Sequence, residues 1–442
     1  MLLRTLFGLL LSAAVYGQGL GSGEYGGPSV LSRGLSPSVL SRNATVSFRP
    51  YITLNGICDT GLTGARIDAN GHLSDTTACG AEVNAGIYGS HQWRQTVLGL
   101  QYVGNYRHYP NASYYDGIDQ SANLELTHRF SKRVVFSLHE IGGVFGRNYQ
   151  TGGVPNVVDS NSLFAPTAEL FDNRVEYVST SADAAVRLSS RWSFDLAGRG
   201  FVVRRQSTAL YGTAGGGAQG DLIYRYSRFG SIGVAYTFLD YSFTKAFGSS
   251  AIHSAALIYS VRLSKVWELR LRGGASRVES LGVEFVAVDP VVAAITGQNI
   301  GVRAAYHINY ISSYGGDLTR AFQHGGLIIS FDRGVTPGNG VYLTSAQEGG
   351  AVSYNYTGVR RWNVSASAGY SRMIALIQTL PDYRSYAAGL GVVRDLGKGL
   401  GVVWRVDGRR YEVGSASILQ RGAYRVTLGL SWSPGDVPLM LW

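Results

Sequence analysis

Arginine is the residue in this sequence best placed for chemistry, because it recurs where polar and apolar side chains alternate. Acids at such positions are fewer: Glu125, Asp183, Asp195, Glu268 and Asp407. A guanidinium offers paired donors to carboxylates and phosphates, so the positive excess predicts a path for anionic solutes. Alternatively, each arginine braces the wall by pairing with an acid on a neighbouring strand. The candidate arginines are Arg129, Arg187, Arg199, Arg262, Arg270, Arg272, Arg405, Arg409 and Arg425.

Histidine and serine give no catalytic set. The chain has eight His residues, but neither His128, His139 nor His307 forms a nucleophile–base motif with the required third partner. The two cysteines lack a paired-His signature and make a poor metal site. We therefore predict no catalytic residue, no metal, no cofactor and no nucleic-acid partner.

The first seventeen residues have the pattern of a cleaved signal peptide. Arg4 precedes an apolar run, and Val15 and Gly17 occupy the positions preferred before the cut. Residues 18 to 43 are rich in Gly, Ser and Pro and contain the tandem "PSVLSRG" and "PSVLSRN". This segment predicts a flexible periplasmic lead, with a docking peptide as the alternative.

Export also bears on Cys58 and Cys79, which lie twenty-one positions apart. In an oxidising compartment this spacing favours a disulfide over free thiols, and the closed loop would contribute roughly 3 kcal/mol.

The composition is that of an exported all-β chain. Only 15% of residues are charged, whereas a soluble domain carries about 25%. The 28 Tyr and 59 Gly residues suit strands and turns. No window reaches the ~18 apolar residues of a membrane helix, and the nearest candidate, 285 to 295, is broken by Asp289 and Pro290. Two classes remain: a soluble β protein or an outer-membrane barrel.

Alternation favours the barrel. In "RWSFDLAGRGFVVRR", Trp192, Phe194 and Leu196 fall on one face, and Asp195 and Arg199 fall on the other. Throughout the chain the second face carries Ser, Gly, Thr and Asn with sparse charges, whereas a surface exposed to bulk water is dense in Lys and Glu. This pattern indicates a confined, water-filled lumen with an apolar face turned to lipid.

Turn lengths predict a transmembrane antiparallel up-and-down barrel over 44–433, followed by a tail at 434–442. Short turns near 90, 131, 190, 228, 265, 323, 360 and 397 alternate with longer connections. Trp192, Trp267 and Trp362 each follow a short turn, which predicts an interfacial girdle. The irregular stretch 279–323 leaves sixteen or twenty strands as alternatives to eighteen. The predicted strands are 45–56, 80–89, 93–107, 119–131, 133–147, 174–188, 191–205, 218–227, 230–244, 250–264, 266–278, 309–322, 325–334, 346–359, 362–374, 383–396, 399–412 and 420–432.

The stretch "RGAYRVTLGLSW" resembles the terminal strand by which Gram-negative outer-membrane proteins are recognised for assembly. The resemblance implies an outer-membrane location, contact with membrane lipid, and insertion by the barrel-assembly machinery. The tail "SPGDVPLMLW" leaves open whether Trp432 or Trp442 is the residue recognised. In architecture the chain is similar to porins and to polysaccharide-export barrels.

A barrel of this size has a lumen too wide for wall side chains to fill. We therefore expect a non-enzymatic pore for passive passage of small polar, preferentially anionic solutes. Two alternatives stand beside it: an export conduit for an anionic exopolysaccharide, and a plugged surface barrel with binding or structural loops.

Overall fold

The computed structural model describes residues 45–62, 76–146, 174–208, 210–338, 340–376, 380–414, 421–434 and 437–440. The predicted signal peptide and lead, and Trp442, lie outside the described residues. Among those described, no helix is long and apolar enough to cross a membrane.

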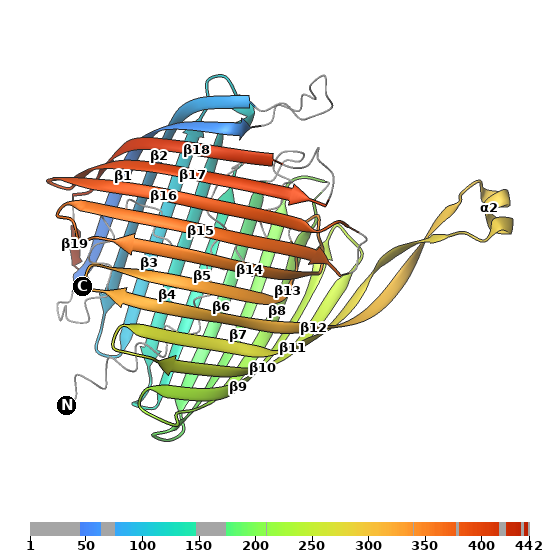
Figure 1. Ribbon diagram of the computed structural model, residues 1–442, viewed down its shortest axis with the longest axis horizontal. Helices are drawn as coiled ribbons and strands as arrows, with labels where there is room; N and C mark the ends of the chain where they lie inside the picture. The colour runs from blue at the N-terminus through green and yellow to red at the C-terminus, as the bar shows by residue number, and fades with distance from the viewer. Residues whose placement is uncertain are drawn as a thin grey trace.

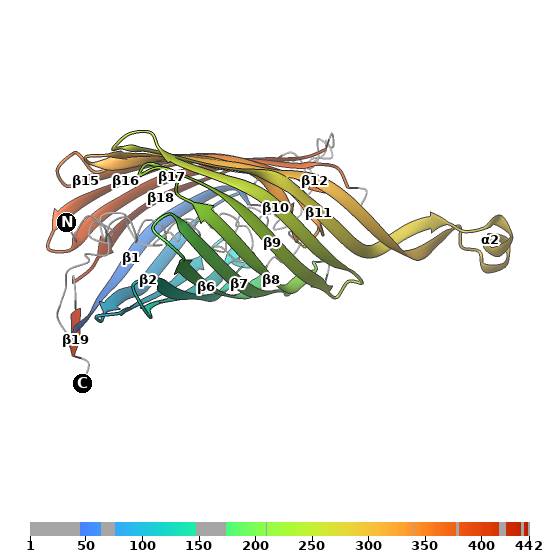
Figure 2. The same ribbon diagram turned by 90° about the horizontal axis from the view of Figure 1, so that it is seen from below.

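Eighteen antiparallel strands form one closed barrel (Figures 1 and 2), which confirms the predicted fold class and strand number. The first nine are β1 (Thr45–Leu62), β2 (Thr76–Gln92), β3 (Thr96–His108), β4 (Gly117–Arg129), β5 (Val134–Phe145), β6 (Val175–Arg187), β7 (Trp192–Arg205), β8 (Gly212–Tyr224) and β9 (Gly230–Thr244). The other nine are β10 (Ser249–Arg262), β11 (Trp267–Ala287), β12 (Ile300–Phe322), β13 (Gly325–Thr336), β14 (Ser345–Tyr356), β15 (Trp362–Ala375), β16 (Tyr383–Gly397), β17 (Leu400–Val413) and β18 (Arg421–Trp432).

Closure depends on β1, which pairs with β2 on one side and with β18 on the other. The β1–β18 register runs from Ile52 opposite Trp432 to Thr60 opposite Tyr424. Within the segment predicted as a tail, β19 (Val437–Met440) pairs with the first residues of β1. Within the barrel wall every strand therefore has two hydrogen-bonded neighbours, and the pairing of β1 with β18 removes the free edge that each would otherwise expose.

The largest departure from the predicted strands is the arm formed by β11 and β12. Each strand continues nine residues past the predicted boundary, so most of the expected loop 279–308 is a two-stranded ribbon. Strand β10 reaches only to Leu281, and beyond it the ribbon projects from the barrel (Figure 1). At its tip lies α2 (Pro290–Thr296), where Asp289 accepts a hydrogen bond from Val291 N. Asp289 and Pro290, which interrupt the apolar run, therefore begin a helix.

The short turns all lie at one end of the barrel, here called the short-turn end, and a serine motif builds four of them. Ser189 Oγ accepts hydrogen bonds from the backbone N–H of Arg191 and Trp192, at 3.2 and 3.0 Å. Ser131, Ser227 and Ser264 accept equivalent bonds in the other turns of this kind. A serine that closes its own turn in this way is a common turn device, and it explains why a serine recurs at the same place in these four turns.

The three predicted girdle tryptophans each begin a strand directly after a short turn, on the outer face. The Arg320 guanidinium lies 4.9 Å from the Trp267 ring, and that of Arg394 lies 5.1 Å from the Trp362 ring. Aromatic rings and arginines that extend toward water are typical of a membrane–water interface. The arrangement is therefore the one expected of a girdle.

Cys58 of β1 and Cys79 of β2 are directly paired residues and are joined by a disulfide, with their Cα atoms 4.1 Å apart. Cys58 alternates with the buried Ile57 and Asp59, so the bridge lies on the outer face. We expect the double variant C58S/C79S to lose roughly 3 kcal/mol of unfolding free energy in denaturant titrations. A reducing agent should reproduce the loss in the wild type and have no effect on the variant. Equal midpoints for the wild type with and without reductant would contradict this role.

Candidate functional site

The two faces of the wall differ as the alternation predicted. Along β18, Ala423, Arg425, Thr427 and Ser431 are buried, whereas the intervening Tyr424, Val426, Leu428 and Leu430 are 43–60% exposed. The exposed apolar residues face outward, and the buried, mostly polar set faces the lumen. The candidate solute path is therefore the lumen face of the strands.

Four carboxylates gather on the lumen face of β4 to β8, and we call them the acidic patch: Glu125, Asp183, Asp195 and Asp221. Asp195 and Asp221 are directly opposite each other on β7 and β8. Asp221 accepts two hydrogen bonds from Gln219 Nε2, at 2.9 and 3.2 Å. Like charges placed directly opposite destabilise a sheet. No ion pair compensates these carboxylates within the described chain, so the patch lowers the stability of the barrel. A role in contacting solutes would explain why the sequence keeps it.

Four arginines stand at the short-turn end on the same side of the barrel, and we call them the mouth arginines: Arg129, Arg187, Arg225 and Arg262. They end β4, β6 and β10 or, for Arg225, directly follow β8. Each has a backbone N–H bonded to a residue of the preceding short turn, so they occupy equivalent places. None of the four makes an ion pair among the described residues. The sequence reasoning missed Arg225, although "RYS" repeats the Arg-x-Ser spacing of the other turns.

On the opposite wall arginines do pair with acids, but these ion pairs lie within single strands, whereas the bracing interpretation expected pairs between neighbouring strands. Arg270 on β11 lies 2.6 Å from Glu268 Oε1, and Arg405 Nε on β17 lies 2.7 Å from Asp407 Oδ2. Arg270 is also directly opposite Asp317 of β12.

Further charged side chains lie on the lumen face of this wall. Asp332 of β13 lies across Gly315, the residue that pairs with Arg272. Asp317 and Asp332 were missed by sequence reasoning, although alternation along their strands places both on the lumen face. Arg409 lies on the lumen face of β17 between Ala387 and Ala423.

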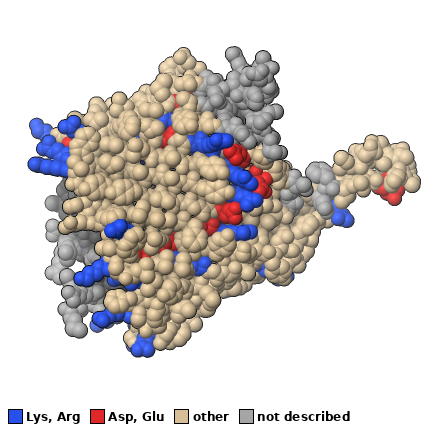
Figure 3. Space-filling model, viewed as in Figure 1, with Lys and Arg blue, Asp and Glu red and all other residues tan. Residues whose placement is uncertain are grey.

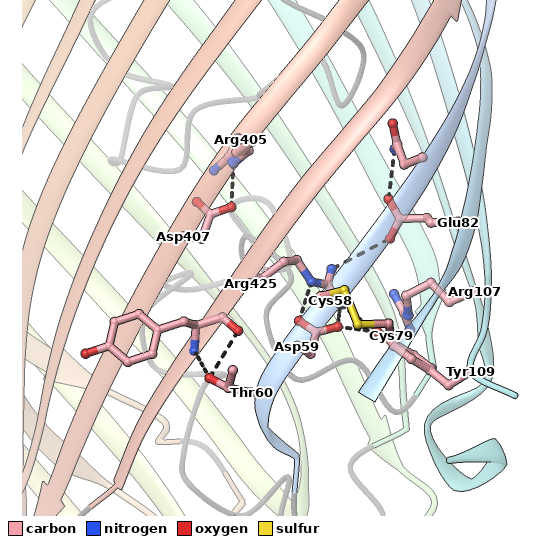
Figure 4. Close-up of polar contacts among 12 residues, drawn as sticks. Cys58, Asp59, Thr60, Cys79, Glu82, Arg107, Tyr109, Arg405, Asp407 and Arg425 are labelled. Atoms are coloured by element: carbon pink, nitrogen blue, oxygen red, sulfur yellow. Dashed lines mark hydrogen bonds and ion pairs between the residues drawn. A yellow bond between two sulfur atoms is a disulfide. The ribbon is translucent and has the colours of Figure 1, made fainter. Parts of the chain in front are cut away.

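Arg425 belongs to a buried group at the barrel seam, which we call the closure cluster (Figure 4). Its guanidinium binds both carboxylate oxygens of Asp59, at 2.7 and 2.9 Å, and approaches Glu82 of β2 at 3.6 Å. Tyr109 donates to Asp59 at 2.5 Å and accepts from Arg425 at 3.0 Å. Burial raises the pKa of the Tyr109 phenol, which keeps this donor protonated. Arg107 binds Asp119 nearby, at 2.5 Å.

The closure cluster spans the seam of the barrel, because Asp59 lies on β1 and Arg425 on β18. Asp59 is fully buried and Arg425 is 9% exposed. Of the nine candidate arginines, Arg425 is therefore placed to hold the wall together. The sequence reasoning missed Asp59, which lies three residues past the predicted end of the first strand.

The loop between β13 and β14 folds inward at the opposite, long-loop end. Thr344 Oγ1 lies 3.1 Å from Tyr241 Oη and 2.5 Å from Ser250 Oγ, which are on the lumen face of β9 and β10. Leu343 packs against an apolar lumen cluster that includes Tyr241 and Phe243. Tyr211 N also donates to Gly340 O at 3.1 Å. This inward loop narrows the lumen, and no sequence pattern predicted it.

Arg199 stands apart from the paired arginines. Its cross-strand neighbours on β6 and β8 are Ser181 and Gly217, which are too small to cover it. No ion pair holds it among the described residues. The structure therefore brings Glu125, Asp183 and Asp195 together and pairs Arg405 with Asp407, but it distributes the arginines over several sites. In the described part of the chain, no group of three or more His, Cys, Asp or Glu side chains is arranged to hold a metal ion.

A closed antiparallel barrel with an apolar outer face and a polar lumen is the fold of an outer-membrane β-barrel. No protein-family model matches the sequence, and no curated protein matches it.

Solved structures match at the level of shape. OpdL of Pseudomonas aeruginosa is 10% identical, with a TM-score of 0.41, over 89% of this chain and 99% of its own. OccAB4 of Acinetobacter baumannii is 10% identical, with a TM-score of 0.41, over 89% of this chain and 100% of its own. The open form of Fiu, the ferric-catecholate import receptor of E. coli K12, is 7% identical, with a TM-score of 0.43, over 86% of this chain and 81% of its own. At these values the matches identify no solute, and the fold rests on the strand pairings themselves.

Proposed function

We propose that the protein is an outer-membrane pore for passive passage of small polar solutes, with a preference for anions. The observation that carries the proposal is the set of mouth arginines, whose charges face the lumen without acid partners in the described chain. Charged rings in a pore select ions of the opposite sign. A solute entering from the short-turn end meets these arginines first and the acidic patch next. The preference for anions is therefore mild.

Membrane placement is part of the same proposal. Exposed side chains on the outer face of β18 are apolar from Tyr424 to Trp432, as contact with lipid requires. The short-turn end would face the periplasm, and the chain would reach the membrane after cleavage of its signal peptide. Trp432, which ends β18 opposite Ile52 and Leu400, would be the aromatic read by the assembly machinery.

The triple variant R129Q/R187Q/R262Q should lose anion preference. Removing three lumen charges reduces the local positive potential, so we expect the anion-to-cation permeability ratio to fall about threefold at low salt. Reversal potentials across planar bilayers in a KCl gradient measure this ratio. R394Q is the matched control, because Arg394 lies at the same end but on the outer face beside Trp362. An unchanged ratio in the triple variant would contradict the proposal.

A second candidate, a closed surface barrel, is favoured by one observation, the inward loop with Thr344. If this loop sealed the lumen, the wild type would carry no current. The variant T344A would carry current only if the loss of the Thr344 contacts released the loop from the lumen wall. Bilayer recordings therefore separate this candidate from the pore.

A further inference from the structure

A line of charged side chains crosses five neighbouring strands on the outer face, and we call it the charged row. Its members are direct cross-strand partners in sequence around the barrel: Arg333, Glu348, Arg372, Arg384 and Glu412, on β13 to β17. On β15, Arg372 alternates with the buried Ser371 and Met373 and shares its face with Trp362, so the row faces outward. Figure 3 shows a stripe of blue and red on this face toward the arm side, with a largely tan area between it and the blue side chains at the opposite edge.

The height of the charged row matches a membrane boundary. Arg372 lies ten residues from Trp362 along β15. At about 3.3 Å per residue and a tilt of about 45°, this separation spans about 23 Å across the membrane, close to the ~25 Å apolar band of outer-membrane barrels. Tyr370 and Tyr386, whose ring centroids are 5.2 Å apart, lie just inside the row, as interfacial aromatics do. The charged row therefore begins where lipid tails end and headgroups start.

The internal pairing of the charged row leaves it short of anions. Arg372 binds Glu348 at 3.1 Å and Asp382 at 2.5 Å, and Arg410, two residues before Glu412, binds Glu412 at 2.9 Å. Arg384 makes no ion pair among the described residues, although it is exposed and lies directly opposite Arg372. Two like charges opposite each other destabilise a sheet. An outside anion held between Arg372 and Arg384 would remove this repulsion.

We propose that the charged row binds anionic, phosphate-bearing lipid headgroups in the leaflet at the long-loop end. Arg384 and the exposed side of Arg410 donate hydrogen bonds to the phosphate. Arg372 donates to it with the N–H groups that its carboxylate partners leave free. Tyr370 and Tyr386 contact the lipid just below its phosphate. Arginine suits this role because its planar donors match phosphate oxygens. The inference requires only that the barrel lies in a membrane, so it stands or falls separately from the pore function.

Native mass spectrometry of the detergent-solubilised protein tests the proposal with phosphatidylglycerol and phosphatidylcholine of identical acyl chains. We expect tighter binding of phosphatidylglycerol, weakened about fivefold in R384Q and roughly 25-fold in R372Q/R384Q, because each arginine near a lipid surface contributes a factor of this size. R384Q is the safer variant for folding, since it breaks no ion pair, and heat-modifiable gel migration checks both variants. The matched control is R204Q on the opposite wall, where the outward-facing Arg204 already lies opposite Glu176.

Several outcomes would overturn the inference. Equal binding of the two lipids would show that the row does not select anionic headgroups, and equal binding of lipid by the wild type and folded R384Q would show that Arg384 does not hold the headgroup. Displacement of phosphatidylglycerol by millimolar inorganic phosphate would show that the row recognises a free ion. A loss of protein dimers in the variants, with lipid binding unchanged, would assign the row to contact between copies of this chain.

Discussion

Replacing Arg425 with Gln is expected to lower the free energy of unfolding by about 3 kcal/mol or more. The substitution leaves the Asp59 carboxylate fully buried, with Tyr109 as its remaining side-chain donor among the described residues. Removing one partner of a buried ion pair is costly because the remaining charge keeps its desolvation penalty. The pair also joins β1 to β18, so its loss weakens the seam that closes the barrel. Urea titration of the refolded protein in detergent, followed by tryptophan fluorescence, measures the change.

R405Q is the matched control for this prediction. Arg405 and Asp407 form a lumen pair of similar length, but the Arg405 side chain is 53% exposed. An exposed pair contributes about 0–1 kcal/mol, so R405Q should unfold near the wild-type midpoint. D59N should reproduce R425Q, and the double variant R425Q/D59N should cost less than the sum of the single variants. Equal stability of R425Q and R405Q would show that the closure cluster does not hold the seam.

The double variant D195N/D221N is expected to raise the anion-to-cation permeability ratio about fivefold. Two opposed carboxylates concentrate negative potential in one patch of the lumen, and neutralising both removes roughly 1 kcal/mol of repulsion toward a passing anion. Asn has the same size as Asp, and the side-chain oxygen of Asn at position 221 can still accept a hydrogen bond from Gln219. Loss of the like-charge pair should also leave stability unchanged or slightly higher. Reversal potentials in a KCl gradient measure the ratio.

The control for the acidic patch is D240N. Asp240 lies on β9, but it alternates with the buried Leu239 and Tyr241 and faces outward. Its neutralisation should leave the ratio unchanged. If D195N/D221N behaved like D240N, the acidic patch would lie off the path of the ions.

Local patterns were sufficient to predict the barrel. A two-residue period fixes which face each side chain takes, so Trp192 and Asp195 were assigned to opposite faces without any tertiary information. Strand β9 was predicted with its observed bounds, 230–244, because short turn signals enclose it. The arm of β11 and β12 was missed because its pairing continues past the barrel rim, where the alternation is interrupted at Asp289 and Pro290.

The site was predicted less completely, because pairing between distant strands decides which charges remain free. Alternation placed Arg425 on the lumen face, but its binding to Asp59 depends on closure between the first and last strands. Similarly, the acidic patch gains its character from Asp221, which comes opposite Asp195 only in the β7–β8 register. The inward loop at Thr344 has no local signature, since its contacts are with Tyr241 and Ser250, about a hundred residues earlier.

The most direct test of the proposed pore is single-channel recording of the refolded wild-type protein in planar bilayers. Heat-modifiable gel migration first verifies that the barrel has formed. We expect steady conductance with a reversal potential displaced modestly toward that of the anion in a KCl gradient. A folded barrel that passes no current, or one that is clearly cation-selective, would contradict the account.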